Sequence, residues 1–389
     1  MVIPLAEAVI DLGAIAHNTR TFARSLGPAA LMAIVKADAF GHGVDQVART
    51  ALDHGASWLG VTSSTEALAL RAHGIGAPIL MWLYPPGAEL EPVIRAGIQI
   101  SAGSGPALDT LAEQATRAGL VAQVHLKVDT GFSRAGAPAD EWLSLVTWAR
   151  KYEVAGRLKI CGLWSHLATA EDPTDPRLAA QLVAFDAAID VARAAGLQPQ
   201  FCHLANSAAA LQLPAARFDL GRIGIGLYGV EPIPGRSFGL RAAMTLQSAV
   251  IQTKRVPAGT EVSYGHDWRA PRSTTLALVP LGFADGLPRA AGPHASVWIR
   301  GVRCRIAGRI TMDQVVLDVG DLPVSVGERV VIFGPGSDGE PTVEDWAAWA
   351  DTNPHEILTG IGARIPRRYL PAQPVPATQP VPATQSGDE

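Results

Sequence analysis

Short, almost continuous apolar runs recur along roughly the first 225 residues and are typical of buried β-strands. The run "LMAIVK", for example, is apolar from Leu31 to Val35 and then ends on Lys36. Ala-rich segments such as "DQVARTALDHG" and "PRLAAQLVAFDAAIDVARAAG" lie between these runs, have helical periodicity and end at a glycine, as helices often do. The apolar runs predict strands at 31–36, 57–62, 78–82, 98–101, 122–128, 159–164, 201–205 and 218–222.

Strands that alternate with helices predict a parallel sheet. Eight such strands within roughly 200 to 250 residues are the pattern of a (β/α)8 barrel of the TIM type. An open doubly wound sheet would show a similar alternation. Because no glycine-rich dinucleotide-binding motif follows the first strand, the sequence favours the α/β barrel.

The pattern changes after about residue 235, where helical periodicity fades and strand-like runs follow one another. These runs are "LQSAVIQTKRV", "TTLALVPLG", "ASVWIRG", "QVVLDVG" and "ERVVIFG", and they predict a mostly β C-terminal domain. One helix is expected in "TVEDWAAWADT", with Thr342 as its N-cap and Asp345 three residues on. We expect four segments: an N-terminal strand in 1–11 that packs with the β domain, the barrel in 12–238, the β domain in 239–370, and a disordered Pro-rich tail in 371–389.

Composition excludes several classes of function. A net charge of −4 gives no electrostatic case for binding nucleic acid, and no Lys/Arg-rich block suggests a membrane surface. The three cysteines form no CxxC pair, so neither a disulfide framework nor a zinc site is expected. The N-terminus does not have the pattern of a signal peptide, and no apolar run has membrane-spanning length. We therefore expect a cytoplasmic protein.

Polar residues close five of the predicted barrel strands, at the end where such barrels carry their catalytic groups. Each alone has an ordinary explanation, such as a lysine that extends to solvent, a hydrogen-bonded core histidine or a tight glycine turn. Together they indicate a site. They are Lys36, Lys127 with Arg134, His166, Asn206 with Ser207, and Arg222 with Gly224.

The last two barrel loops indicate a phosphate, which barrels commonly bind there. Ser207 offers a hydroxyl, and the backbone amides of Gly224 and Gly226 can approach an anion closely. A phosphate near a buried Lys36 suggests pyridoxal phosphate (PLP), whose aldehyde needs a lysine amine for a Schiff base. Burial lowers the pKa of such an amine and makes it reactive.

The residues lie in motifs that resemble those of the alanine racemase family, PLP-dependent enzymes that combine a (β/α)8 barrel with a β domain. The resemblance extends from about Glu7 to Tyr369. The motifs that carry it are, in this order, "VKADAFGHG", "KVDTGFSRAG", "LWSHLATAED", "ANSAA", "GRIGIGLYG", "VSYGHDW", "LGFADG", "GRITMDQ" and "ARIPRRY".

The resemblance implies that Lys36 holds PLP and acts as one acid/base, with Tyr264 from the second domain as the other. Racemisation needs two such groups because a proton leaves one face of Cα and returns on the other. The family works as a homodimer in which each barrel borrows this tyrosine from its neighbour. A tyrosine has a pKa near 10, so it needs cationic neighbours, which the resemblance identifies as His166 and Arg222.

The remaining roles also follow from the resemblance. Arg222 faces the pyridine nitrogen and leaves it unprotonated, because a guanidinium does not give up its proton. Arg134 holds the substrate carboxylate. Lys127 stands at a position that is often carbamylated in the family, where a carbamate would orient Arg134; the alternative is a simple exposed lysine. Met312 and Asp313 belong to a loop that reaches the partner's substrate. The full cofactor-binding set is Lys36, His166, Asn206, Ser207, Arg222, Gly224, Ile225 and His355, and no metal is expected.

Four positions depart from the family pattern. Phe40, Phe283 and His355 replace tyrosines, and Thr311 replaces a common cysteine. Two lost phenols near the phosphate predict weaker retention of PLP, although His355 offers a charged contact in return. The altered entrance leaves serine or a broader range open beside alanine. By resemblance, the product is D-alanine for peptidoglycan.

Three other readings are disfavoured. A non-catalytic PLP carrier would lack the second domain that carries Tyr264. A basic-amino-acid decarboxylase of this fold usually has an acidic residue where Arg222 stands. A metal-dependent barrel hydrolase would need an HxH pair as metal ligands, and the sequence contains none.

Overall fold

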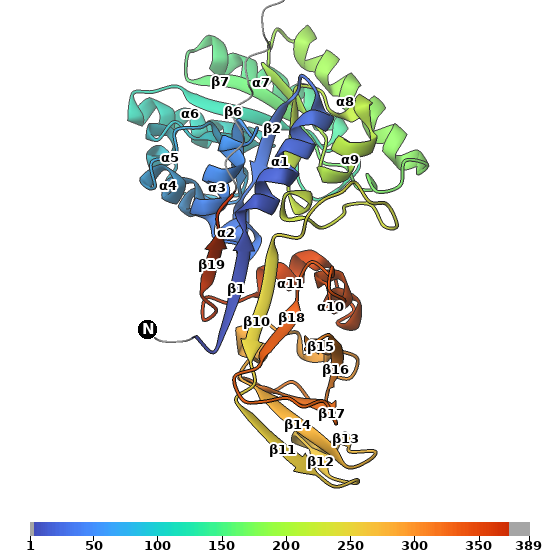
Figure 1. Ribbon diagram of the computed structural model, residues 1–389. Coiled ribbons are helices and arrows are strands. Elements are labelled where there is room, and N and C mark those ends of the chain that lie inside the picture. Colours follow the sequence, from blue (N-terminus) through green and yellow to red (C-terminus); the bar gives the residue numbers. More distant parts are fainter. Residues whose placement is uncertain (1–3, 373–389) are drawn as a thin grey trace, which may run out of the picture.

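The computed structural model describes residues 4–372, which form a barrel and a β-rich C-terminal region (Figure 1). The repeated "QPVPAT" segment, for which a disordered tail is expected, falls at 373–384 and lies outside the described residues. Within residues 4–372, no helix is both long and apolar enough to span a membrane.

The barrel is a sheet of eight parallel strands within the described residues, in the order β8-β7-β6-β5-β4-β3-β2-β9. This confirms the predicted barrel over the doubly wound alternative, and each strand lies within a few residues of its prediction. The strands are β2 (Ala30–Ile34), β3 (Trp58–Val61), β4 (Ile79–Met81), β5 (Gln99–Ala102), β6 (Ala122–Lys127), β7 (Leu158–Trp164), β8 (Phe201–His203) and β9 (Leu220–Ile223).

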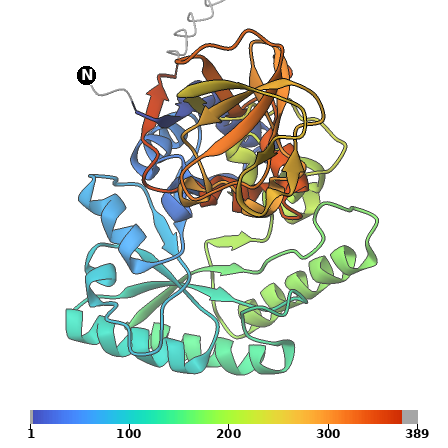
Figure 2. The same cartoon turned by 90° about the horizontal axis from the view of Figure 1, so that it is seen from below.

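Helices follow the strands and lie outside the sheet, as the blue-to-green part of the chain shows in Figure 2. Side-chain caps begin several of them: Asp11 accepts a hydrogen bond from Ala14 N, and Ser63 and Glu66 form a capping box. The helices are α1 (Leu12–Leu26), α3 (Val44–Asp53), α4 (Ser64–Ala72), α5 (Glu91–Arg95), α6 (Gly105–Ala118), α7 (Ala139–Val154), α8 (Pro176–Ala194) and α9 (Ser207–Gln212).

The ring of strands has a seam between β8 and β9, which do not form a regular ladder. Two backbone bonds cross it, from Asp219 N to Cys202 O at 3.0 Å and from Arg222 N to Ala205 O at 3.0 Å. The Asp219 carboxylate adds a third bond by accepting from Cys202 N at 2.7 Å. The barrel is therefore nearly closed, and side chains contribute to its closure.

The C-terminal region is built on a sheet of nine strands within residues 4–372, in the order β11-β14-β17-β16-β15-β18-β10-β1-β19. Strand β1 pairs antiparallel with β10 and parallel with β19, and Figure 1 shows it leading from this sheet into α1. The strands are β1 (Ala6–Asp11), β10 (Met244–Ala249), β11 (Gln252–Val256), β14 (Thr274–Val279), β15 (Ser296–Ile299), β16 (Val302–Ile306), β17 (Val315–Gly320), β18 (Arg329–Phe333) and β19 (Arg367–Leu370).

The run "LQSAVIQTKRV" is not one strand but two, β10 and β11. Val250 N bonds to Glu328 O, beside β18, whereas Ile251 N bonds to Leu278 O on β14. The chain therefore changes neighbours between these two residues, and the pairing must break. The predicted helix is confirmed: Thr342 caps α10 (Val343–Trp349) in a capping box with Asp345.

Short elements complete the C-terminal region. Helix α11 (Pro354–Gly360) packs against α2 (Lys36–Gly41) of the barrel. A small two-stranded ribbon, β12 (Glu261–Val262) with β13 (Trp268–Arg269), lies at the end of the C-terminal region far from the barrel (Figure 1). Single 3-10 turns are η1 (Pro214–Ala216), η2 (Ile225–Tyr228), η3 (Tyr264–His266), η4 (Phe283–Asp285) and η5 (Arg289–Ala291).

Candidate active site

Lys36 stands two residues beyond the end of β2, as the first residue of α2, and its side chain is half-buried. Burial and the charge of Arg134 lower the pKa of its amine, while Glu66 acts in the opposite direction. A lysine with a lowered pKa is neutral more often at a given pH, and the neutral amine is the nucleophile. The structure therefore gives Lys36 the environment that its sequence position predicts.

The backbone after Lys36 forms a left-handed turn. Residues 37–40 have φ between 52° and 53°, and none of the four is a glycine. Left-handed helical geometry costs about 1–2 kcal/mol for each such residue. Hydrogen bonds offset this strain: Glu66 Oε1 accepts from Ala37 N at 2.7 Å, and Asp38 Oδ1 accepts from Val44 N at 2.8 Å.

Glu66 is a residue that the sequence reasoning missed. Its other carboxylate oxygen accepts from Thr62 N at 2.8 Å and from Ser63 N at 3.1 Å, so one side chain joins the start of α4 to the turn after Lys36. The signal was present as the capping-box pattern Ser63-x-x-Glu66, which predicts a helix start. The pattern does not predict the additional bond to Ala37.

Arg222 is buried on β9, with 5% of its surface exposed. Its two terminal nitrogens donate to the carbonyls of Ser165 (2.7 Å), His203 (2.9 Å) and Leu204 (3.1 Å) and to Nδ1 of His203 (3.0 Å). These acceptors lie at the ends of β7 and β8, so the guanidinium bridges the seam of the barrel. None of these bonds uses Nε.

His166 follows β7, and its Nδ1 lies 3.4 Å from a terminal nitrogen of Arg222. Burial, Arg222 and further cations lower the pKa of this imidazole to about 3. His166 is therefore neutral at physiological pH in the single chain, and its role as a cationic neighbour of a tyrosine stays a prediction. Because Nδ1 faces a donor, the ring proton resides on Nε2.

Four cationic side chains gather at the barrel mouth: Lys36, Lys127, Arg134 and Arg222. Lys127 Nζ lies 4.3 Å from the ring centre of Trp164, and Cζ of Arg222 lies 4.9 Å from the same centre. Burial, Arg222 and Arg134 lower the pKa of Lys127 to about 8, with Asp129 acting in the opposite direction. Lys127 is half-buried rather than a freely exposed lysine. Such an excess of positive charge favours the binding of anions.

The loops after β8 and β9 meet at Ser207. Its hydroxyl accepts from Gly224 N at 3.1 Å and from Gly226 N at 3.4 Å, so both predicted amides already face one oxygen. Packing also requires a glycine at position 226, because a Cβ there would lie 2.4 Å from Phe22 Cζ. Asn206 caps α9 by accepting from Ala209 N, and Ile225 begins η2.

Phe40 contacts both the barrel and the C-terminal region at this end of the barrel. Its ring stacks on Tyr228 at 4.6 Å between centres and lies 5.8 Å from the ring of His355 on α11. Burial and the charge of Lys36 lower the pKa of His355. His355 is therefore neutral at pH 7, which argues against a charged contact from this side chain.

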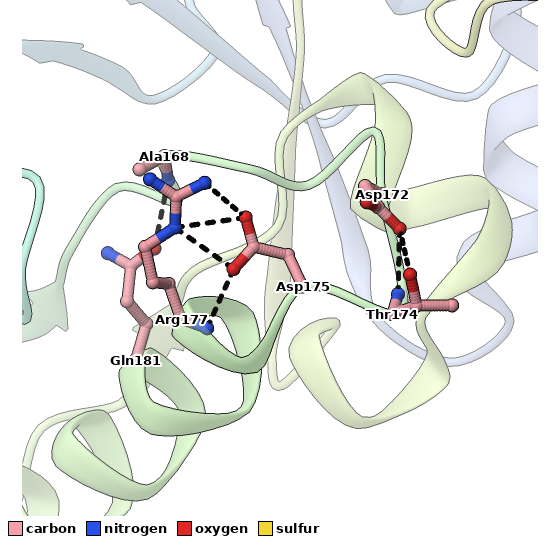
Figure 3. A network of polar contacts seen from close by, with 6 residues as sticks. All are labelled: Ala168, Asp172, Thr174, Asp175, Arg177 and Gln181. Atoms are coloured by element: carbon pink, nitrogen blue, oxygen red, sulfur yellow. Dashed lines mark hydrogen bonds and ion pairs between the residues drawn. The ribbon is translucent and has the colours of Figure 1, made fainter.

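The loop that carries His166 is tied to α8 (Figure 3). Gln181 accepts from Ala168 N at 2.9 Å. It also donates to His166 O at 3.0 Å. Asp172 accepts from both the backbone and the hydroxyl of Thr174 in the same loop. These bonds fix the backbone on which His166 stands.

Tyr264 is not brought to Lys36 within one chain. It belongs to η3, beside the β12–β13 ribbon, and 74% of its surface is exposed. Tyr264 lines two adjoining hollows together with Arg309 and Thr311, and Met312 and Asp313 line the second of them. All lining residues of both hollows lie between 263 and 316, so the barrel contributes none.

Comparison with known proteins identifies the two regions. A family described as "Alanine racemase, N-terminal domain" matches residues 10–232, and one described as "Alanine racemase, C-terminal domain" matches residues 243–369. An alanine racemase of Frankia casuarinae is 50% identical over 367 residues, which cover 93% of this chain and 96% of the relative. An alanine racemase of Thermobifida fusca is 49% identical over 368 residues, covering 94% and 98%.

Solved structures agree with these relatives. The alanine racemase of a D-cycloserine-producing Streptomyces lavendulae superposes with a TM-score of 0.94 at 43% identity, covering 95% of this chain and 98% of that one. An alanine racemase of Bartonella henselae, solved with covalently bound pyridoxal phosphate, has a TM-score of 0.86 at 30% identity, with 95% and 100% covered.

We predict that Glu66→Ala weakens the turn after Lys36 and changes the reactivity of its amine. Three backbone amides lose an acceptor, which lowers the free energy of unfolding by about 1–3 kcal/mol. Because the carboxylate counteracts the lowering of the Lys36 pKa, its loss lowers that pKa further. The pH profile of Schiff-base formation with a small aromatic aldehyde, trapped by reduction and located by mass spectrometry, should shift to lower pH at Lys36.

Glu113→Ala, an exposed glutamate on α6, is the control and should change neither quantity. A Glu66→Ala protein with an unchanged pH profile would show that Glu66 has no electrostatic influence on Lys36.

Proposed function

The chain belongs to the alanine racemase family, and from this premise we propose a two-base mechanism in which Lys36 and Tyr264 exchange protons with the substrate Cα. Its reaction is the racemisation of alanine, and its cofactor is pyridoxal phosphate. The observation that carries the proposal is the presence of a lysine with a lowered pKa and a buried arginine at one barrel mouth.

The described residues fit this cofactor. Lys36 offers the amine that would hold the aldehyde, and the surplus of positive charge at the mouth suits a phosphate. We propose that Arg222 faces the pyridine nitrogen and that the phosphate is held by the loops after β8 and β9, through Asn206, Ser207, Gly224 and Ile225, with His166 and His355 beside the cofactor. When bound, PLP would supply the electron sink that acidifies the substrate Cα–H bond.

In this mechanism Lys36 and Tyr264 act from opposite faces of the substrate. One removes the Cα proton and the other returns a proton, so each enantiomer is the product of the other. Arg222 is the cation that stabilises the phenolate of Tyr264. His166 contributes a hydrogen bond rather than a charge, because its neutral ring carries its proton on Nε2 and can donate it to the phenolate.

We further propose that Arg134 binds the substrate carboxylate, for which its planar, two-pronged donor set is suited. Lys127 is placed to form a carbamate. With a pKa of about 8, roughly a tenth of its amines are neutral at pH 7 and able to attack CO2. The new N–C bond forms as the nitrogen loses a proton, and the cation becomes an anion that orients Arg134.

The geometry of one chain supports a homodimer with shared sites. Tyr264 is exposed and distant from the barrel mouth, and the large apolar side chains of Phe283 and Met312 are exposed in the same part of the C-terminal region. A cluster of exposed apolar residues is typical of a protein interface. We propose that this face, with Met312 and Asp313, completes the barrel mouth of a second copy.

The carbamate is tested by ¹³C NMR of the holoenzyme in ¹³C-bicarbonate. A carbamate resonance is expected in the native protein and in Lys159→Arg, an exposed control, and should be absent from Lys127→Arg. A crystal structure with a bare ammonium at Lys127 would contradict the proposal.

The shared site is tested by mixing two inactive variants. A heterodimer of one Lys36→Ala subunit and one Tyr264→Phe subunit contains one site with both native residues and one site with neither. It should therefore recover about half of the native activity, given the two-fold symmetry of the dimer. If both residues act within the same chain, each site lacks one of them and the heterodimer stays inactive.

The reaction is tested by incubating the holoenzyme with separate L-amino acids and following D-product by chiral chromatography. We expect D-alanine to dominate and serine to react more slowly. Lys36→Ala and Tyr264→Phe should each lose at least about 100-fold in rate, as for other acid/base groups. Tyr152→Phe, on the outer helix α7, is the matched control. No D-product with PLP bound would favour a non-catalytic carrier.

Biological supply of D-alanine for peptidoglycan is part of the same proposal. Expression of the chain should rescue growth of a bacterium that requires external D-alanine. Rescue must disappear in the Lys36→Ala variant for the interpretation to hold.

A further inference from the structure

A chain of buried hydrogen bonds continues from Arg222 into the barrel, away from the mouth. His203 on β8 accepts from Arg222 through Nδ1 at 3.0 Å, and its Nε2 lies 2.8 Å from Nδ1 of His125 on β6. Nε2 of His125 in turn lies 2.7 Å from Oε1 of Gln99 on β5. Both imidazoles are completely buried, and Gln99 is 8% exposed.

Because Arg222 is the first residue in this series of hydrogen bonds, its chemistry determines which atom donates in each of them. Arginine can only donate, so Nδ1 of His203 must be the acceptor and its proton must lie on Nε2. That proton is donated to Nδ1 of His125, whose own proton is therefore on Nε2 and is donated to Gln99. Burial and the charge of Arg222 lower the pKa of both histidines, that of His125 to about 3, so both rings are neutral.

The surrounding side chains hold the two rings in place. Trp164 stacks on His203 with an angle of 6° between the rings, and Trp58 meets His125 edge to face. Gly162 on β7 leaves room for the second imidazole, because a Cβ at this position would lie 2.3 Å from Nδ1 of His125. These contacts hold both rings in a chain of hydrogen bonds that runs from Arg222 through His203 and His125 to Gln99, which we call the relay.

We propose that His125 and Gln99 are positioning residues that lock His203 as a hydrogen-bond acceptor and thereby hold Arg222 in one orientation toward the cofactor's pyridine nitrogen. The proposal rests on the proposed role of Arg222. Without the acceptor on His125, the His203 ring can carry its proton on Nδ1, where it would face a donor of Arg222. The guanidinium would then lose one partner and gain freedom to turn.

The proposal also explains why polar side chains lie in the middle of an otherwise apolar barrel. A buried polar group without a partner costs about 1–3 kcal/mol, and each member of the relay satisfies the next. Gln99 ends the relay with a neutral acceptor. A carboxylate in its place would attract a second proton to His125, and Nδ1 of His125 would then donate to His203 instead of accepting from it.

The first test measures the tautomer of His203 in the holoenzyme by long-range ¹H–¹⁵N correlation spectra with ¹⁵N-labelled histidine. The native protein should show His203 protonated only on Nε2. His125→Leu should move the proton to Nδ1 in a substantial fraction of molecules. His125→Gln, which keeps an acceptor and a donor, should restore the native state. Gln99→Leu should shift the tautomer in the same direction by a smaller amount.

The second test measures reaction specificity as the ratio of transamination to racemisation turnovers. We expect this ratio to rise about tenfold in His125→Leu, a change of about 1.4 kcal/mol in relative barriers, and to return toward the native value in His125→Gln. Leu145→Ala, a buried substitution on α7, serves as a control for general destabilisation and should leave the ratio unchanged.

The outcomes separate the relay from the proposed function. A native protein that makes no D-alanine overturns the proposed function, whatever the state of His203. A native protein that racemises alanine, with His203 tautomer and reaction specificity both unchanged in His125→Leu and Gln99→Leu, overturns the relay alone. If His125→Leu does not fold, the Gln99→Leu and His125→Gln proteins decide the matter.

Discussion

The permanent charge of Arg222 inside the barrel is the constraint on which the rest of the site depends. A buried guanidinium must be satisfied by acceptors, and the structure supplies carbonyls from the ends of β7 and β8 together with Nδ1 of His203. The same bonds bridge the seam that the backbone leaves between β8 and β9. Burial keeps the neighbouring histidines neutral, and the charge of Arg222 adds to this effect because a second cation beside it would be repelled. The closure of the barrel and the proton positions on the histidines therefore depend on one side chain, to which we also assign the orientation of the cofactor.

The other cations at the barrel mouth bear on which ligands can bind there. Lys36, Lys127 and Arg134 stand near Arg222. Besides burial, the charge of Arg134 lowers the pKa of both lysines, and Arg222 lowers that of Lys127 as well. In the proposed site, a phosphate, a substrate carboxylate and a carbamate on Lys127 would each remove part of the repulsion among these cations. In the proposed site, a bound amine without a carboxylate would leave the charge of Arg134 uncompensated. The proposed site would therefore select a substrate carboxylate by charge balance.

The sequence was sufficient for the barrel strands and for the polar residues at their ends, since buried parallel strands are continuous apolar runs and Lys36 or Arg222 interrupts such a run visibly. The sequence did not predict the features that depend on several residues far apart in the chain. Four consecutive left-handed residues without glycine after Lys36 depend on Glu66, and no local pattern announces them. The neutrality of His166 depends on burial and on cations from other strands. The proposed placement of Tyr264 at the barrel mouth of a second copy rests on the family resemblance, because the chain alone does not bring Tyr264 to Lys36.

The seam between β8 and β9 has a consequence for folding during synthesis on the ribosome. Strands β2 to β8 can pair in the order in which they are synthesised, each with its predecessor, but β9 must return to β2 across nearly 190 residues, from Ala30 to Leu220. Only when residues 220–223 have emerged can Arg222 reach the waiting carbonyls of β7 and β8. A nascent barrel is therefore open between β8 and β2. Until the ring closes, it lacks the arginine that we propose to face the pyridine nitrogen of the cofactor.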